Sequence, residues 1–350
     1  MLIDTKIYTT FAYPFYFITV GLLVLVLFVG TEINGAKSWF DIFGFRAQPS
    51  EIAKFATCLA LAKYLSGLNV DLKHFKTKVY SVAIIAIPAV LIIIQGDVGT
   101  ALVYLGLVLV LHREGLEPIF LILGISLLVL TILALVFDKY LLIAGLLALG
   151  LVGAYQGRKN KQVLFLISGV FVASVIYIFS LNYIMTNVLE PHQRERIEVF
   201  SGKAELSWNV EQSIIAIGSG GATGKGFLKG TQNTYEFLPA KSTDFIFSTI
   251  GEEEGFIGSM ILISLFTVFM IRILFLADRQ RSKFSRIYGY GVVTIFLIHY
   301  IINIGMTIGL VPVIGIPLPF ISYGGSSLVS FTILLFIFLK LDSQRLMVLR

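Results

Sequence analysis

The chain has 350 residues, of which 57% are hydrophobic and only 14% are charged, and its mean hydropathy is +0.88. These values exclude a water-soluble globular protein and indicate a polytopic membrane protein. The net charge of +6 accompanies no pattern typical of nucleic-acid binding. We therefore attribute it to membrane topology and to contact with anionic membrane lipid, and we expect no nucleic-acid partner.

Apolar stretches of membrane-spanning length recur along the whole chain. The first, residues 11–29, lacks a convincing cleavage site, so we expect it to remain as a transmembrane helix. Together the stretches predict an all-α fold with ten transmembrane helices. The predicted spans are residues 11–30, 49–66, 79–95, 98–112, 117–137, 140–156, 161–185, 245–276, 287–311 and 321–341.

Lysine and arginine fall in alternate loops, on the side that also carries both ends of the chain. By the positive-inside rule, this pattern predicts cytoplasmic N and C termini. One of the remaining, extracytoplasmic loops is far longer than the others, at about residues 186–243 between the seventh and eighth spans. We expect residues 1–350 to form a single integral-membrane domain that carries this loop.

The long loop contains the glycine-rich stretch 218–226, flanked by arginine and lysine residues. Glycine lets backbone N–H groups approach phosphate oxygens, and basic side chains complement their charge. The stretch nonetheless fails the Walker A and dinucleotide-binding patterns. It is therefore either a flexible, solvated turn or a phosphate site.

Asp244 ends the loop and directly precedes the eighth apolar span. The order Ser-Thr-Asp before an apolar helix is typical of an N-cap. Asp244 also shares a helical face with Ser248, Gly251 and Gly255, and a carboxylate partly removed from water suits a general base. Capping and catalysis both remain open from the residues alone.

Other external edges carry polar residues as well. The acidic run 252–254 would be costly at bilayer depth, so it lies in the interfacial layer or faces a wet cavity. Glu51 and Lys54 stand three residues apart and could pair, ordinarily at the interface. Asp97, between two glycines, belongs to a tight turn or to the wall of a site. Prolines before residue 321 predict irregular backbone at the start of the last span.

All these polar features lie on one predicted face of the membrane. Carboxylates, basic residues and glycine-rich turns gather there, beside a lipid phase from which an amphiphilic ligand could enter. The residues therefore predict an extracytoplasmic site for an amphiphilic, phosphorylated ligand. The scattered histidines and the single cysteine, Cys58, support neither a disulfide nor a metal site.

Six segments that span essentially the whole chain read QPSEIAK, DVGTALV, QRER, IAIGSGGATGKGFLKGTQ, FLPAKSTDFIF and NIGMTIGLVPVIGIPLPFISYGGSS. They resemble segments of the SEDS family (shape, elongation, division and sporulation proteins). GTQ followed by FLP is more similar to the rod-shape branch than to the division branch. The chain departs from the family at Gln95 and Gly96, where proline usually precedes the aspartate, and at Glu254, which is usually apolar.

The resemblance implies a peptidoglycan polymerase of the cell-elongation machinery in the bacterial cytoplasmic membrane. It also implies a class B penicillin-binding protein as transpeptidase partner. By the family motif the catalytic aspartate is Asp244, the base for inverting transfer of the growing glycan from its undecaprenyl diphosphate carrier to the GlcNAc 4-hydroxyl of lipid II. The alternatives are a flippase of the lipid-linked precursor and a non-catalytic scaffold for the penicillin-binding protein.

The leaving diphosphate needs stabilisation of its negative charge, which basic residues could provide. A divalent cation, Mg or Mn, could share this role, although the sequence shows no dedicated metal cage. The candidate substrate-binding residues are Glu51, Lys54, Asp97, Arg194, Arg196, Lys225, Lys229, Lys241, Ser322, Tyr323, Gly324, Gly325 and Ser326.

Overall fold

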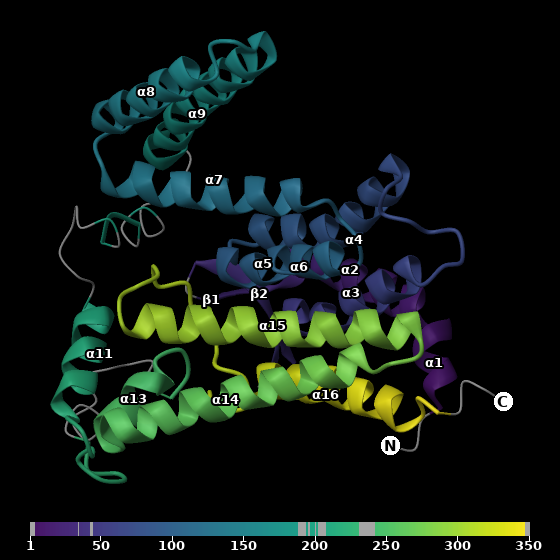
Figure 1. The fold of residues 1–350 in the computed structure, drawn as a ribbon. Helices are drawn as coiled ribbons and strands as arrows, with labels where there is room; N and C mark the ends of the chain where they lie inside the picture. The colour runs from purple at the N-terminus through teal and green to yellow at the C-terminus, as the bar shows by residue number, and fades with distance from the viewer. Residues whose placement is uncertain are drawn as a thin grey trace. The chain divides into compact units, whose positions relative to one another are not determined.

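The computed structural model describes residues 4–33, 35–42, 45–187, 194, 197–199, 201, 208–230 and 242–346 (Figure 1). Contacts divide the chain into two compact units, Met1–Glu117 with Asn209–Arg350 and Pro118–Trp208, and each is described by itself. The prediction that residues 1–350 form one domain stays a prediction.

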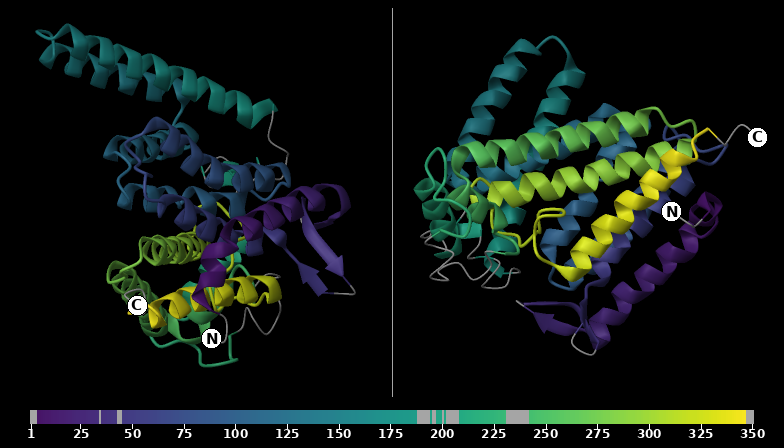
Figure 2. Two further views of the ribbon diagram at one scale, coloured as in Figure 1. Left: turned by 90° about the vertical axis from the view of Figure 1, so that its right-hand side faces the viewer. Right: turned by 90° about the horizontal axis from the view of Figure 1, so that it is seen from below.

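The larger unit is built from helices, with one small sheet after the first long helix. Strands β1 (Thr31–Ile33), β2 (Ala36–Ile42) and β3 (Phe45–Ala47) form an antiparallel meander, and β2 packs beside α2 (Figure 2). The helices are α1 (Thr5–Thr10), α2 (Ala12–Val29), α3 (Pro49–Leu65), α4 (Phe75–Ile94), α5 (Val98–Leu105), α6 (Val108–Arg113), α11 (Trp208–Ser219), α13 (Ile246–Glu253), α14 (Gly255–Asp278), α15 (Lys283–Thr307) and α16 (Gly325–Ser343).

Helix α3 is the most deeply buried helix near the N-terminus, and it contacts α2, α4, α15 and α16. Small residues allow these helices to approach closely, as is usual inside membrane bundles. A Cβ atom on Gly291 of α15 would lie only 2.8 Å from the Cys58 sulfur of α3. The close contact of α3 with α15 therefore depends on small side chains, and it positions the polar groups of both helices.

The predicted membrane fold is confirmed. Among the described residues, eight helices are long and apolar enough to cross a membrane, and α5 with α6 forms a shorter apolar stretch. Helix α3 has 17 residues and carries charges near both ends. Each predicted span thus corresponds to one helix or to two consecutive helices. The eighth span differs in detail, because it breaks at Glu254 into α13 and α14.

The two ends of α15 have different surroundings. Near its Lys283 end, Thr5 donates to Gln344 (Oγ1 to Oε1, 2.5 Å), and Arg279 pairs with Asp342 (Nη2 to Oδ2, 2.6 Å). Helices α11 and α13 lie at the Thr307 end (Figure 1). A helix of 25 residues is about 37 Å long at about 1.5 Å per residue. The terminal segments and α13 are therefore separated by about the thickness of a membrane.

The smaller unit consists of α7 (Pro118–Val136), α8 (Lys139–Gln156) and α9 (Lys161–Asn187). Helices α7 and α8 bury none of their residues, and α9 buries only Ile178. Asp138 caps α8 by accepting a hydrogen bond from the backbone N–H of Tyr140 at 2.8 Å. Three apolar helices with outward-facing side chains are typical of segments that contact lipid.

Candidate active site

The segment around Asp244 is a turn that leads into α13. Helix α13 begins at Ile246, and Phe245 occupies its N-cap position. The interpretation of Asp244 as the N-cap is therefore wrong, because Asp244 lies one residue ahead of that position. The Asp244 side chain is half-buried, whereas Phe245 is buried in a small apolar cluster with Val210. Burial of Phe245 anchors the turn and leaves Asp244 beside it with partial access to solvent.

The backbone of this turn is held by two other parts of the chain. The Asn303 side chain on α15 donates to the Asp244 carbonyl (Nδ2 to O, 2.8 Å). The Ser322 hydroxyl donates to the Thr243 carbonyl (Oγ to O, 2.6 Å), and the Tyr323 backbone N–H donates to the Ser242 carbonyl at 2.8 Å. Three consecutive carbonyls are thus fixed, and they hold the backbone of the turn at Asp244.

Residues 308–324 join α15 to α16 without regular helix, as the prolines predicted. The Asn303 amide donates to the Ile316 carbonyl (2.7 Å), and the His299 imidazole contacts the Pro317 carbonyl (Nδ1 to O, 3.0 Å). Gly315 has φ +72°, and a Cβ atom there would lie 3.4 Å from Asp244 Oδ2. This irregular segment therefore places backbone directly beside the Asp244 carboxylate, at a position without a side chain.

His299, Asn303 and Thr307 form a polar stripe on one face of α15, and all three are at most 1% exposed. Ser213 of α11 donates to the Thr307 carbonyl (Oγ to O, 2.7 Å), which ties α11 to the same stripe. Reasoning from sequence did not give His299 a role. The signal that could have found it is the spacing of four residues between polar side chains in an apolar helix.

The expected pairing of Glu51 with Lys54 is confirmed, but the pair is not interfacial. Lys54 Nζ lies 2.8 Å from Glu51 Oε1, and their side chains are 1% and 3% exposed. Lys54 Nζ also lies 3.0 Å from His299 Nε2 and 4.7 Å from the centroid of the Phe331 ring. The Ser330 hydroxyl donates to the Glu51 carbonyl (2.5 Å). Helices α3, α15 and α16 therefore meet around one buried ammonium group.

Asp97 lies in the tight turn that its sequence allowed, and its place in the wall of a site stays a prediction. It caps α5 by accepting from the Thr100 backbone N–H (3.0 Å) and hydroxyl (2.7 Å), and it accepts from Gln48 Nε2 (2.8 Å). A Cβ atom on Gly99 would lie 2.5 Å from the Ile314 carbonyl oxygen. The turn at Asp97 therefore also packs against the irregular segment that lies beside Asp244.

The glycine-rich stretch 218–226 contains an exposed turn at residues 221–223, and its last residues pack onto the junction of α13 and α14. The choice between a solvated turn and a phosphate site stays a prediction. The backbone N–H groups of Lys225 and Gly226 donate to the carbonyls of Glu252 and Glu253 at 3.0 and 2.9 Å. A Cβ atom on Gly224, at φ +77°, would lie 2.1 Å from the Glu253 carbonyl oxygen. The glycines here permit close contact of two backbones.

The acidic run is divided between buried and exposed positions. Glu252 is fully buried and pairs with Lys225 (Oε1 to Nζ, 2.8 Å), Glu253 is buried, and Glu254 is exposed. The ion pair compensates the charge of Glu252, as a buried carboxylate requires. Lys225 thereby links the glycine-rich stretch to α13.

The remaining candidate residues differ in their surroundings. Ser322 is buried, Tyr323 is exposed, and Gly324 is the N-cap residue of α16, which begins at Gly325. Ser326 is half-buried. Arg194 pairs with Glu198 (Nε to Oε1, 2.6 Å), Lys229 is exposed, and Arg196 and Lys241 lie outside the described residues.

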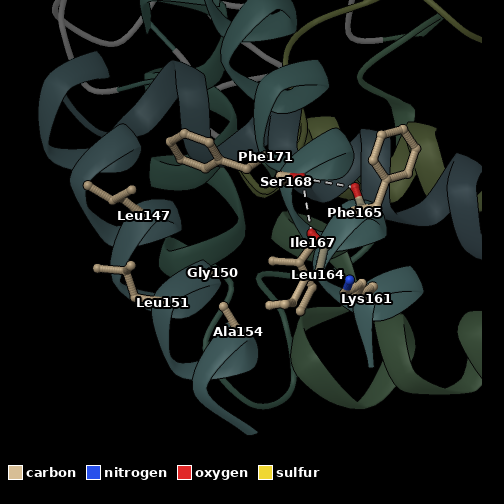
Figure 3. A pocket seen from close by; sticks show the side chains of 10 residues that line it. All are labelled: Leu147, Gly150, Leu151, Ala154, Lys161, Leu164, Phe165, Ile167, Ser168 and Phe171. Atoms are coloured by element: carbon tan, nitrogen blue, oxygen red, sulfur yellow. Dashed lines mark hydrogen bonds between the residues drawn. The ribbon is translucent and has the colours of Figure 1, made fainter. Parts of the chain in front are cut away.

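Within the part of the chain that is described, no three His, Cys, Asp or Glu residues are grouped to hold a metal ion. A groove of about 580 Å³ lies between α8 and α9 (Figure 3). Its lining is apolar except for Lys161 and Ser168, so it has no carboxylate to serve as a general base. The groove is lined by Leu147, Gly150, Leu151, Ala154, Lys161, Leu164, Phe165, Ile167, Ser168 and Phe171.

Comparison with known proteins identifies the family. The sequence model of the FtsW, RodA and SpoVE proteins, described as "Cell cycle protein", matches residues 1–149 and 141–346. The chain belongs to this family. The resemblance to SEDS proteins is therefore confirmed, and the relatives named RodA and MrdB confirm its rod-shape branch.

Relatives with names and solved structures agree with this assignment. Peptidoglycan glycosyltransferase RodA of Treponema pallidum is 36% identical over 336 residues, covering 88% of this chain and 77% of that protein. Peptidoglycan glycosyltransferase MrdB of Escherichia coli K12 is 32% identical over 332 residues, covering 93% of this chain and 76% of that protein. A chain from a solved peptidoglycan synthase complex, 28% identical, gives a TM-score of 0.67 over 98% of this chain and 84% of that chain. The rod-shape-determining protein RodA of Thermus thermophilus, 24% identical over 98% of this chain and 81% of that chain, shares the fold with a TM-score of 0.59.

Proposed function

We propose that this chain is the peptidoglycan polymerase of the cell-elongation machinery. It transfers the growing glycan from its undecaprenyl diphosphate carrier to the GlcNAc 4-hydroxyl of lipid II, with inversion. The named glycosyltransferase relatives, 36% and 32% identical, support the activity. The assignment of the catalytic role to Asp244 rests on the turn at this residue, where the Asn303 side chain donates to the Asp244 carbonyl at 2.8 Å.

In the proposed reaction Asp244 is the general base. Its carboxylate accepts the proton of the GlcNAc 4-hydroxyl as that oxygen attacks the anomeric carbon of the α-linked MurNAc diphosphate lipid. A β-1,4 bond forms, the bond from the anomeric carbon to the phosphate oxygen breaks, and undecaprenyl diphosphate leaves with the electron pair. The glycine at position 315, close to Asp244 Oδ2, supports this role because it leaves space beside the carboxylate.

The leaving diphosphate needs positive charge more than it needs a proton. Exposed Lys229 is available for this role among the described residues, and Arg194, Arg196, Lys225 and Lys241 stay predicted contacts. A divalent cation carried by the diphosphate could share the role. Glu51 and Lys54 are too deeply buried to meet a substrate in this conformation, so we assign them to support of the site.

The partner and the membrane orientation are part of the proposal. We assign a class B penicillin-binding protein as the transpeptidase partner, supported by the related chain from a peptidoglycan synthase complex. We place the Asp244 turn on the extracytoplasmic face of the bacterial cytoplasmic membrane. The basic residues near the Lys283 end of α15, at the opposite end from Asp244, support this orientation.

The test is polymerisation of lipid II by the purified complex with its penicillin-binding protein, reconstituted in vesicles. We expect Asp244→Asn to lower the rate of glycan formation at least about 100-fold, as loss of a general base does. Asp138→Asn is the matched control, because Asn also caps a helix and Asp138 lies at an exposed helix start in the other compact unit.

Different outcomes would separate the alternatives. An Asp244→Asn complex that makes strands at the normal rate would refute the assignment of the base and would fit a scaffold. A wild-type complex that makes no polymer from lipid II supplied on the outer face would refute the polymerase and leave a flippase. Thermal unfolding and partner binding of Asp244→Asn should match those of the wild type.

A further inference from the structure

His299 is a buried polar residue to which the reaction described above assigns no part. It is 1% exposed, and both of its ring nitrogens lie within hydrogen-bond distance of polar atoms. Nδ1 lies 3.0 Å from the Pro317 carbonyl oxygen, and Nε2 lies 3.0 Å from Lys54 Nζ. The ring also contacts Phe331 edge-on, with 4.8 Å between centroids.

These two partners define the protonation state of the ring. A carbonyl oxygen can only accept, so Nδ1 must carry the hydrogen that is donated to Pro317. A lysine ammonium can only donate, so Nε2 must offer its lone pair to Lys54. His299 is therefore neutral, with its single N–H on Nδ1. Its ring links two groups, because Nε2 accepts from the Lys54 ammonium and Nδ1 donates to the Pro317 carbonyl.

The Lys54 ammonium is itself fixed from several sides. It donates to Glu51 Oε1 at 2.8 Å and to His299 Nε2, and it lies 4.7 Å from the Phe331 ring centroid. A buried ammonium with these partners has little freedom to move, because each donor already has an acceptor or a ring face. The Lys54 ammonium therefore offers His299 Nε2 a donor in a fixed position.

Through Nδ1, His299 contacts the segment that packs against Asp244. His299 and Asn303 lie one turn apart on α15 and bind the consecutive carbonyls of Pro317 and Ile316. The same Asn303 amide donates to the Asp244 carbonyl, and Gly315 is the residue beside Asp244 Oδ2. A shift of Pro317 would therefore also displace Ile316 and Gly315, and Gly315 lies beside the Asp244 carboxylate.

We propose that His299 is a positioning residue for the glycosyl transfer: it couples the buried ion pair of Lys54 with Glu51 to the segment 315–317 and so holds that segment against Asp244. The inference rests on the proposed role of Asp244 as the base. An apolar ring of the same shape would fill the same space beside Phe331. It would leave the Lys54 ammonium and the Pro317 carbonyl without their link.

The test uses three substitutions in the complete complex with its penicillin-binding protein, with kcat and KM measured for lipid II polymerisation. His299→Phe keeps an aromatic ring but neither nitrogen. His299→Gln keeps one acceptor and one donor that can serve Lys54 and Pro317. His299→Asn carries the same amide on a side chain one methylene shorter, so it cannot reach both partners, and it serves as a second variant if the Phe protein does not fold.

We expect kcat to fall about 10- to 100-fold in His299→Phe and His299→Asn, because displacement of a catalytic group by about 1 Å costs up to about 100-fold. KM should stay within about threefold, since no substrate contact is lost. His299→Gln should recover kcat to within about threefold of the wild type. A purely structural role would predict neither the constant KM nor the recovery by glutamine.

His112 provides a matched control. It is half-buried, and its Nδ1 lies 3.2 Å from the Leu116 carbonyl, but it lies on α6 near the Lys283 end of α15. We expect His112→Phe and His112→Gln to leave kcat unchanged. An equal loss of kcat in the His112 and His299 variants would overturn the inference.

Other results would overturn it as well. A folded His299→Phe or His299→Asn complex with normal kcat would do so, as would a glutamine variant that is as slow as the phenylalanine variant, or a loss confined to KM. Asp244→Asn is measured in the same assay. If that variant is inactive while His299→Phe is fully active, only the inference on His299 fails; if Asp244→Asn is active, the proposed function fails and the inference with it.

Discussion

Replacement of Lys54 by methionine leaves the Glu51 carboxylate buried without a cation. Methionine is close to lysine in length and is apolar, so the substitution removes the charge with little change of volume. The two side chains are only 1% and 3% exposed, and the charged atoms lie 2.8 Å apart. Removal of one partner from a buried pair destabilises a protein by about 3–5 kcal/mol, and we expect Lys54→Met to fall in this range.

A more exposed pair with the same nitrogen–oxygen distance is the control. Lys78 Nζ lies 2.8 Å from Glu117 Oε1, but the Lys78 and Glu117 side chains are 17% and 54% exposed. Exposed ion pairs contribute about 0–1 kcal/mol, so Lys78→Met should have a correspondingly small effect. The comparison separates burial from distance, because the distance is the same in the two pairs.

The measurement is the free energy of unfolding by denaturant in one detergent, for Lys54→Met, Glu51→Met and the double variant. The double variant should be less destabilised than the sum of the single variants, by about 2–3 kcal/mol, since it leaves no uncompensated charge. Additive effects, or a Lys54→Met effect no larger than that of Lys78→Met, would refute the reasoning.

Two further predictions concern the backbone around Asp244 and α13. Gly221→Ala and Gly224→Ala both place Ala at positive φ (+57° and +77°), but only Gly224 lies against the Glu253 carbonyl oxygen. We expect a loss of about 1–2 kcal/mol of unfolding free energy for Gly221→Ala and a larger loss for Gly224→Ala; equal losses would contradict the close-contact explanation. Ser322→Ala removes the donor to the Thr243 carbonyl, so unfolding free energy should fall by about 1–3 kcal/mol and the rate of polymerisation should fall with it. An unchanged rate from lipid II would show that this hydrogen bond does not position the turn.

Hydropathy by itself determined the membrane class and the positions of the spans. A spanning helix must satisfy its backbone hydrogen bonds internally and present apolar side chains to the lipid. The hydropathy of its sequence therefore indicates directly that it spans the membrane. The break of the eighth span at Glu254 was not predicted. It depends on Gly255, at φ +66°, and on the glycine-rich stretch that packs against this junction.

Local order alone drew attention to Asp244, as a carboxylate between a polar loop and an apolar helix, and the family resemblance supplied its predicted catalytic role. Its supports could not be identified in this way, because Asn303 and Ser322 lie 59 and 79 residues from the carbonyls that they bind. The capping interpretation was wrong for a related reason. Helix α13 begins at Ile246, so the cap position belongs to Phe245, whose burial against Val210 depends on α11.

The three-residue spacing of Glu51 and Lys54 determined that the two side chains could pair, since residues three apart share one helical face. Only the tertiary structure decided that the pair is buried and that His299, 245 residues from Lys54, is its partner. The physical reason is that burial is a property of the neighbouring helices. Helices α15 and α16 exclude water from the pair, and the sequence of α3 does not predict where those two helices lie.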